Sequence, residues 1–218
     1  MTELTLVIGN KNYSSWSLRP WIALKQAGIP FTERLIPLFD ENWDSEISKV
    51  SPTKKVPVLI DGDITICETL AILEYAHELY PQKGLWPETM QARSVARSVS
   101  SEMHAGFGNL RNHMPMNIRK DLTGRGMGPG VEEDISRITQ LWNDCKNRFG
   151  QDGDFLFGSF CNADAMFAPV VSRFKTFGVK LDPVSQAYCE AVLNTQAYLQ
   201  WQTEALKETW IVEEDELD

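Results

Sequence analysis

Hydrophobic and polar residues follow two different patterns along the chain, and the change falls near residue 80. Before it, short apolar runs rich in β-branched residues alternate with stretches of helical periodicity. The strands and helices expected there cover residues 4–8, 31–38, 40–50, 58–60, 64–66 and 69–80. A further helix follows the first strand, with Ser17 as its N-cap, Pro20 in its first turn and Gly28 as its stop. The expected order is strand, helix, strand, short helix or loop, strand, strand, helix.

Beyond residue 80 the strand signals disappear. Residues 81–89 contain proline and glycine at turn positions and predict a linker. The helices expected after it cover residues 93–113, 131–149, 165–177, 183–194 and 197–207. Four glycines within residues 122–130 follow no strand, so they indicate a flexible loop rather than a phosphate-binding one. We therefore expect an α/β domain over residues 1–80 and an all-helical domain over residues 90–218.

Pro57 stands near the start of the apolar run 56–60, where a buried strand is expected. Proline cannot donate a hydrogen bond to a sheet, so the start of this strand is open to something other than a neighbouring strand. If the Val56–Pro57 bond is cis, the N–H and C=O groups of Val56 turn outward, and an extended peptide-like ligand can pair with them. The alternative is that Pro57 only ends the pairing of a strand.

Glu68 and Thr69 stand at the start of the helix expected over residues 69–80. The unpaired N–H groups and partial positive charge of a helix N-terminus favour a carboxylate. The Thr69 hydroxyl can contribute to the same anion, and Glu68 can accept a hydrogen bond from an ammonium group beside it. The alternative is a local role, in which Thr69 caps the helix and Glu68 favours its dipole.

Ser14 and Ser15 lie in the loop expected between the first strand and the first helix, at the end of the sheet where α/β folds bind ligands. A nucleophilic serine needs an adjacent base, and the three histidines, His77, His104 and His113, are all distant in sequence. A hydroxyl that donates a hydrogen bond to a bound thiolate fits better, because it favours the charged form of the thiol. The remaining alternative is a pair of ordinary loop serines.

Charge and cysteine content argue against several classes of partner. The 30 acidic and 21 basic residues give a net charge of −9 without a basic block, so neither nucleic acid nor a membrane is an expected partner. The four cysteines form no Cys-x-x-Cys pair, so neither a metal site nor a disulfide framework is expected. With no signal sequence and no long apolar run, we expect a cytoplasmic protein. The acidic residues 213–218 predict a solvated, frayed end.

Two motifs resemble a known family. Lys-Val-Pro-Val-Leu at residues 55–59, with a hairpin and then Glu-Thr-x-Ala-Ile-x-x-Tyr at residues 68–75, resembles the glutathione-binding half of the cytosolic glutathione S-transferases. Tyr-Ser-Ser-Trp-Ser-Leu-Arg-Pro-Trp at residues 13–21 resembles the serine-type signature of the zeta class, the maleylacetoacetate isomerases. Trp16 replaces the cysteine of that signature and Trp21 its second arginine. These two departures bear on the isomerase activity, not on the stabilisation of a thiolate by a serine.

The resemblance implies a thioredoxin-like N-terminal domain with a cis proline after Val56, an all-α C-terminal domain, and glutathione as co-substrate without a metal. It also implies which residues bind glutathione. Val56, followed by Pro57, pairs with the cysteinyl backbone, Glu68 and Thr69 hold the γ-glutamyl end, and Lys55 lies near the glycyl carboxylate.

By the same resemblance, Ser14 matches the catalytic serine, and Ser15 is the second candidate for contact with the thiol. The family places its second substrate over the first helix of the C-terminal domain. By position alone, the residues expected to face that substrate are Met103, His104, Phe107 and Arg111. Among them Arg111 or His104 can meet an acidic electrophile. The resemblance further implies a homodimer.

The function expected from these residues is that of a glutathione transferase in detoxification, with a serine hydroxyl that activates the thiol for attack on a small electrophile. Two alternatives stay open. One is isomerisation or dehalogenation of the zeta type, and the other is a non-catalytic glutathione-binding or interaction module. A thiol-disulfide oxidoreductase would need a cysteine near residues 14–17, and none stands there.

Overall fold

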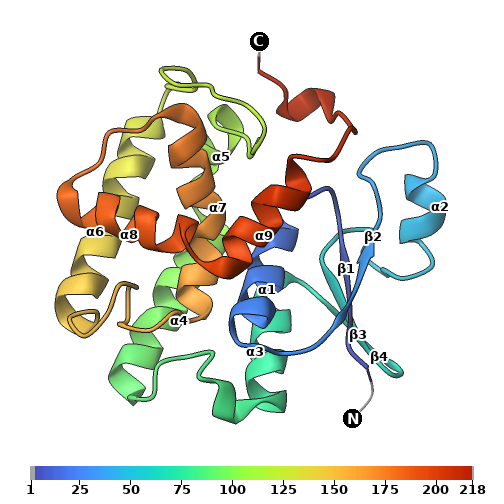
Figure 1. Cartoon of the computed structure of the whole chain (residues 1–218), viewed down its shortest axis with the longest axis horizontal. Coiled ribbons are helices and arrows are strands. Elements are labelled where there is room, and N and C mark those ends of the chain that lie inside the picture. Colours follow the sequence, from blue (N-terminus) through green and yellow to red (C-terminus); the bar gives the residue numbers. More distant parts are fainter. Residues whose placement is uncertain (1–2, 218) are drawn as a thin grey trace.

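The computed structural model describes residues 3–217 and has two parts of different secondary structure (Figure 1). The N-terminal part consists of β1 (Thr5–Ile8), α1 (Ser15–Gln26), β2 (Thr32–Leu35), α2 (Trp43–Ile47), β3 (Val58–Asp61), β4 (Ile64–Cys67) and α3 (Thr69–Leu79). Its strands form one mixed sheet in the order β2-β1-β3-β4, in which β1 is parallel to β2 and the other two pairs are antiparallel. The order of elements is the expected one, although β2 and α2 are shorter than the patterns indicate.

The alternation of side chains along β1 separates two hydrophobic clusters. Leu6 and Ile8 join the main core, whereas Val7 joins a smaller cluster with Ile47 of α2 and Val58 of β3. Figure 1 accordingly shows α1 and α3 on one side of the sheet and α2 on the other. The sheet is therefore covered on both faces.

The C-terminal part is helical. It contains η1 (Pro81–Lys83), α4 (Met90–Ala105), α5 (Gly108–His113), α6 (Val131–Phe149), α7 (Asn162–Phe177), α8 (Pro183–Leu193), α9 (Gln196–Ala205) and η2 (Glu213–Asp215). Almost every residue of α7 is buried, and this helix packs against both α1 and α4. The main hydrophobic core therefore continues from the sheet into the helical part.

Asp164 organises the start of α7, which begins three residues earlier than the pattern indicates. Its carboxylate is fully buried and accepts hydrogen bonds from the backbone N–H groups of Cys161, at 2.8 Å, and Leu156, at 3.1 Å. Burial raises the pKa of Asp164 to about 6, although these bonds oppose the rise. Asp164 therefore has a structural role at the start of α7.

The single long helix expected over residues 93–113 is wrong. The chain forms α4 and α5 instead, with an extended Gly106 and a left-handed Phe107 (φ 58°) between them. A Cβ atom at position 106 would lie 2.8 Å from the carbonyl oxygen of Glu102, so this backbone conformation requires glycine. The break re-orients the residues that follow it.

The first helix also differs from its expectation. Ser14, not Ser17, is the N-cap residue of α1, and Pro20 lies inside the helix. Pro20 has no N–H group to donate to the carbonyl oxygen of Trp16, one turn before. That oxygen instead accepts a hydrogen bond of 3.2 Å from the hydroxyl of Thr69. The bond missing from α1 is thus replaced by a bond to the first residue of α3.

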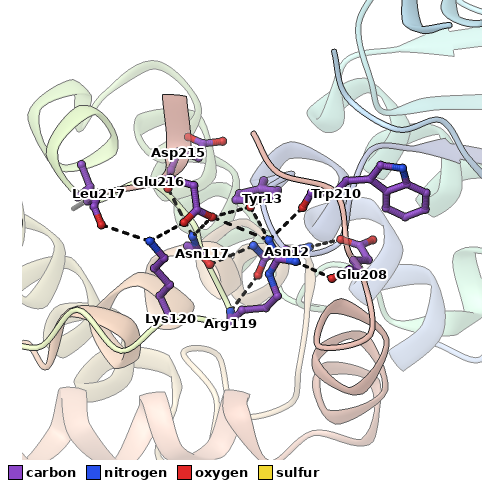
Figure 2. A network of polar contacts seen from close by, with 10 residues as sticks. All are labelled: Asn12, Tyr13, Asn117, Arg119, Lys120, Glu208, Trp210, Asp215, Glu216 and Leu217. Atoms are coloured by element: carbon purple, nitrogen blue, oxygen red, sulfur yellow. Dashed lines mark hydrogen bonds and ion pairs between the residues drawn. The ribbon is translucent and has the colours of Figure 1, made fainter. Parts of the chain in front are cut away.

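The expectation of a solvated, frayed end over residues 213–218 is wrong for Glu216, whose carboxylate accepts hydrogen bonds from the Tyr13 hydroxyl and the Asn117 amide. Glu213 and Glu214 are exposed, as expected. The C-terminal segment, residues 206–217, runs back from α9 to the loop before α1 (Figures 1 and 2). There the Glu208 carboxylate accepts hydrogen bonds from the N–H groups of Lys11, at 2.7 Å, and Asn12, at 2.9 Å. Two adjacent N–H groups form a natural site for one carboxylate, so acidic residues dock here rather than stay in solvent. Asp218 lies outside the described residues.

Candidate active site

The start of α3 carries Glu68 and Thr69. Glu68 is the N-cap residue and has a φ of 77°, which is strained for a residue with a side chain. Its side chain is largely exposed, with a carboxylate oxygen 3.6 Å from Nε2 of His104 on α4. Thr69 is buried and makes no side-chain cap; its hydroxyl donates to Trp16. The side chain of Thr69 therefore connects two helices, while its backbone N–H group is one of the unpaired donors of α3.

The Val56–Pro57 peptide bond is cis, as the resemblance implies. Ser51 holds the backbone just before it. The buried hydroxyl of Ser51 donates to the carbonyl oxygen of Lys55, at 2.8 Å, and accepts from the N–H group of Lys55, at 3.2 Å. Strand β3 begins directly afterwards at Val58, so Val56 is fixed between a clamped residue and a strand.

Two cavities meet at Trp16, Lys55 and Val56. The first, here the α3 cavity, has a volume of about 190 Å³, and its other lining residues are Thr53, Pro57, Glu68, Thr69 and His104. The second, here the serine cavity, has a volume of about 450 Å³ and contains Ser14 and Ser15. An extended molecule bound at the start of α3 can therefore pass Val56 and reach the two serines.

Ser14 and Ser15 lie at the N-terminus of α1 with 7% and 8% of their surface exposed. The hydroxyl of Ser14 donates to that of Ser17, at 2.7 Å, and Ser17 in turn accepts from the N–H group of Gly9, at 3.1 Å. Ser17 is fully buried, so it gives Ser14 a fixed orientation. Within residues 3–217, neither serine is hydrogen-bonded to a histidine, which agrees with a donor rather than a nucleophile.

Two arginines line the serine cavity, and a third stacks on Trp16, one of its lining residues. The lining arginines are Arg111 and Arg173, and the guanidinium of Arg19 lies 4.3 Å from the ring centre of Trp16. Burial lowers the pKa of Arg19 well below its ordinary range, and repulsion from Arg173 and Arg111 lowers it further. Burial also lowers the pKa of Arg173 to about 10, so this arginine stays charged at neutral pH. The cavity therefore has a positive potential that suits an anionic group.

Two of the four residues expected to face the second substrate lie elsewhere. Met103 and Phe107 belong to the main hydrophobic core and line neither cavity. His104 lines the α3 cavity, and Arg111 lines the serine cavity. Met103 and His104 are neighbours on α4 and so point in directions about 100° apart around the helix axis, Met103 into the core and His104 toward the α3 cavity.

Other residues of the serine cavity come from distant segments. Arg173 belongs to the central helix α7, and Asp215 belongs to the C-terminal segment. Arg173 follows the apolar run over residues 165–171, a signal that could have indicated it, since a charge buried in such surroundings usually has a specific role. Asp215 carries no such signal, because it is one of several acidic residues at the end of the chain.

The comparisons with known proteins agree with this geometry. The N-terminal domain model of the glutathione S-transferases matches residues 13–79. Glutathione S-transferase 1 of Dianthus caryophyllus is 32% identical over 112 residues, about half of either chain (51% of each). Maleylacetoacetate isomerase of Rattus norvegicus is 31% identical over 175 residues, which cover 78% of this chain and 77% of that protein. The chain belongs to the glutathione S-transferase family.

Solved structures of glutathione transferases have the same fold as this glutathione S-transferase family member. A glutathione transferase homologue from Burkholderia with bound glutathione has a TM-score of 0.72 and 23% identity, and the alignment covers 94% of this chain and 98% of that one. The expected family, with its zeta-like relatives, and the expected thioredoxin-like plus all-α fold are confirmed. The enzyme class, a glutathione transferase with glutathione as co-substrate, is confirmed with them.

Across residues 3–217, no helix has both the length and the apolar composition needed to cross a bilayer. In the same described part, no group of three or more histidine, cysteine or acidic residues is arranged to hold a metal ion.

Proposed function

We propose that Ser14 stabilises the thiolate of glutathione for attack on a small electrophile in the serine cavity. One observation carries the proposal. Val56, next to the cis bond, lines both cavities, so a tripeptide that begins at Glu68 and Thr69 would bring its central cysteine to Ser14. Glutathione would supply the nucleophilic sulfur, whose thiol has an ordinary pKa of about 8.5.

The α3 cavity fits the γ-glutamyl end of glutathione. The first N–H groups of α3, including that of Thr69, would bind its carboxylate, and Glu68 would pair with its ammonium group. The strained φ of Glu68 supports a functional reason for its position. Val56 would pair with the cysteinyl backbone, and Lys55 would face the glycyl carboxylate.

Ser14 would act as a hydrogen-bond donor. Its hydrogen now points to Ser17, and rotation about a single bond would turn it toward a sulfur atom in the cavity. The N-terminus of α1 adds positive potential at the same place. With a halogenated aromatic electrophile, the thiolate sulfur would form a bond to the aromatic carbon, and halide would leave with the electron pair. Arg111 supports a preference for electrophiles that carry an anionic group.

A glutathione-dependent isomerase of the zeta type is the second candidate function. The rat relative is named maleylacetoacetate isomerase, and the arginines of the serine cavity suit an acidic substrate. Trp16 and Trp21 stand where the zeta signature has other residues, so a transferase remains the first proposal.

A turnover screen with and without glutathione tests the proposed function. The panel contains halogenated aromatics, unsaturated carbonyls, peroxides and maleylacetone-like acids, and products are identified by mass spectrometry. Conjugates that form only with glutathione and enzyme are the expected result. Isomerised product without a conjugate would favour the second candidate. Glutathione binding by calorimetry without any turnover would instead indicate a non-catalytic binding module.

Glu68→Gln is expected to raise KM for glutathione by about tenfold and to change kcat little. Loss of a charge-assisted hydrogen bond costs about 1.5–3 kcal/mol, and Glu68 is placed to contact only the end of glutathione remote from the sulfur. Initial rates at varied glutathione concentration measure the effect. Glu78→Gln, which removes the same charge from an exposed position of α3, is the control. An unchanged KM in Glu68→Gln would contradict the contact.

The finer organisation of the protein is also a proposal. We propose that the domains span residues 1–80 and 90–218 with a linker over residues 81–89, which the change from mixed to helical structure after α3 supports. We further propose a cytoplasmic homodimer, as in the family. Solution mass by light scattering at several concentrations tests the dimer, and fractionation of producing cells tests the location.

A further inference from the structure

The C-terminal segment forms part of the wall of the serine cavity and is fixed on both sides of that wall. Glu208 is one anchor. Glu216 is the other, since its carboxylate accepts hydrogen bonds from the Tyr13 hydroxyl, at 2.6 Å, and the Asn117 amide, at 2.9 Å, and pairs with Lys120 at 2.5 Å (Figure 2). Burial would raise the pKa of Glu216, but these contacts outweigh it and hold the pKa below its ordinary value.

Asp215, adjacent to this second anchor, faces the serine cavity beside Arg173. Arg173 uses its Nε to bond the carbonyl oxygen of Met114, at 2.7 Å, and its Nη1 to bond that of Pro169, at 3.3 Å. Asp215 acts on it through charge: it raises the pKa of Arg173, against the effects of burial and of Arg111. Asp215 is therefore a counter-ion for Arg173.

The charges around Asp215 are mainly positive. In the part of the chain that the structure describes, Asp215 is the one carboxylate that lines the serine cavity. The titratable and charged groups that face it from the surrounding elements are Tyr13, Lys54, Lys55, Arg111 and Arg173, together with Glu214 and Glu216 of its own segment. An anionic ligand and the Asp215 carboxylate would therefore be attracted by the same arginines.

We propose that Asp215 determines the selectivity of the serine cavity for the charge of the electrophile. Its carboxylate neutralises part of the positive charge of Arg173, so an electrophile with an anionic group must compete with it, whereas a neutral electrophile does not. The inference rests on the proposed function in one respect, because it takes the serine cavity to be the place where the electrophile binds.

The charge of Asp215 changes in an accessible pH range. Burial raises its pKa to about 6; attraction to Arg173 opposes the rise, and repulsion from Glu214 and Glu216 adds to it. Below that pH the carboxyl group of Asp215 is neutral and does not compete with an anionic electrophile for the arginines. Above that pH the carboxylate does compete for them. The preference for an anionic over a neutral electrophile therefore falls as the pH rises through about 6.

A matched pair of electrophiles tests the proposal: a chloronitrobenzoate and the corresponding chloronitrobenzamide, which share the leaving group and differ in charge. In Asp215→Asn, we expect KM for the benzoate to fall about fivefold, because the variant lacks a negative charge that lies several ångströms from the carboxylate of the ligand. KM for the benzamide is expected to stay unchanged. The ratio of the two kcat/KM values cancels the ionisation of the thiol. This ratio is expected to depend on pH near 6 in the wild type and to lose that dependence in the variant.

Glu214→Gln is the control, because it removes the same charge from the neighbouring exposed residue outside the cavity. Equal effects of the two variants, or equal effects of Asp215→Asn on both electrophiles, would overturn the proposal. Binding of the unreactive nitrobenzoate and nitrobenzamide, followed by quenching of tryptophan fluorescence, needs no turnover. If the wild type turns over neither electrophile, the proposed function fails, while tighter nitrobenzoate binding by Asp215→Asn would still support the role of Asp215.

Discussion

Ser14→Ala is expected to lower kcat with a halogenated aromatic electrophile about ten- to hundredfold. A hydrogen bond to a charged group contributes about 1.5–3 kcal/mol, and each 1.4 kcal/mol or so changes a rate tenfold. KM for glutathione is expected to change little, because the proposed contacts at Val56 and at the start of α3 remain. A spectroscopic titration of enzyme-bound glutathione should show the pKa of its thiol return toward about 8.5.

Ser15→Ala is the matched control, since it removes the same atom from the adjacent position of the same cavity. A large loss in Ser15→Ala with full activity in Ser14→Ala would transfer the role to Ser15. Normal rates in both variants would reject thiolate stabilisation by a serine. Ser17→Ala should show a smaller loss of kcat and a smaller shift of the thiol pKa in the same direction, because it removes the partner that orients Ser14.

Asp164→Ala is expected to destabilise the protein by about 3 kcal/mol, without direct contact with either cavity. It removes the acceptor of two buried N–H groups, those of Leu156 and Cys161, each of which costs about 1–3 kcal/mol when left unpaired. The variant no longer has to bury a carboxylate, and this gain offsets part of the cost. Urea denaturation followed by circular dichroism measures the change. Asp164→Asn keeps one acceptor and should lose less, and equal stability of all three proteins would contradict the role.

The effect of Asp164→Ala should also depend on pH. The pKa of Asp164 is raised to about 6 in the folded protein from an ordinary 3.8, so the folded state binds this proton more tightly than the unfolded chain. Its contribution to stability is therefore fully present below about pH 4 and is lost as the pH rises through about 6. We expect a larger difference between wild type and Asp164→Ala near pH 5 than near pH 8. The opposite trend would show that the carboxylate is stabilised by its site.

Local patterns in the sequence predict a large part of the fold. The hairpin of β3 and β4 follows from two apolar runs around Asp61 and Gly62, and α6 follows from its acidic start, apolar face and basic end. The break at Gly106 is harder to predict, since glycine weakens a helix without always ending it. The start of α1 is ambiguous for another reason, because Ser14 and Ser17 are equally good caps by type.

The candidate site is predictable mainly from short motifs whose residues are close in sequence. Val56, Pro57, Glu68 and Thr69 belong to one hairpin-to-helix unit, so their spacing places them together. Asp215 reaches the serine cavity because the C-terminal segment docks on residues that are 89 to 203 positions away. A run of acidic residues indicates solvation by itself, and only the partners in the fold decide otherwise.

Pro20 limits which changes the N-terminal part tolerates. Any other residue at this position would restore an N–H group that competes with Thr69 for the carbonyl oxygen of Trp16. A substitution that strengthens α1 by helix propensity would therefore loosen the connection to α3, 53 residues away. Selection for stability alone could favour such a variant, in which α1 and α3 are less firmly connected at the candidate site.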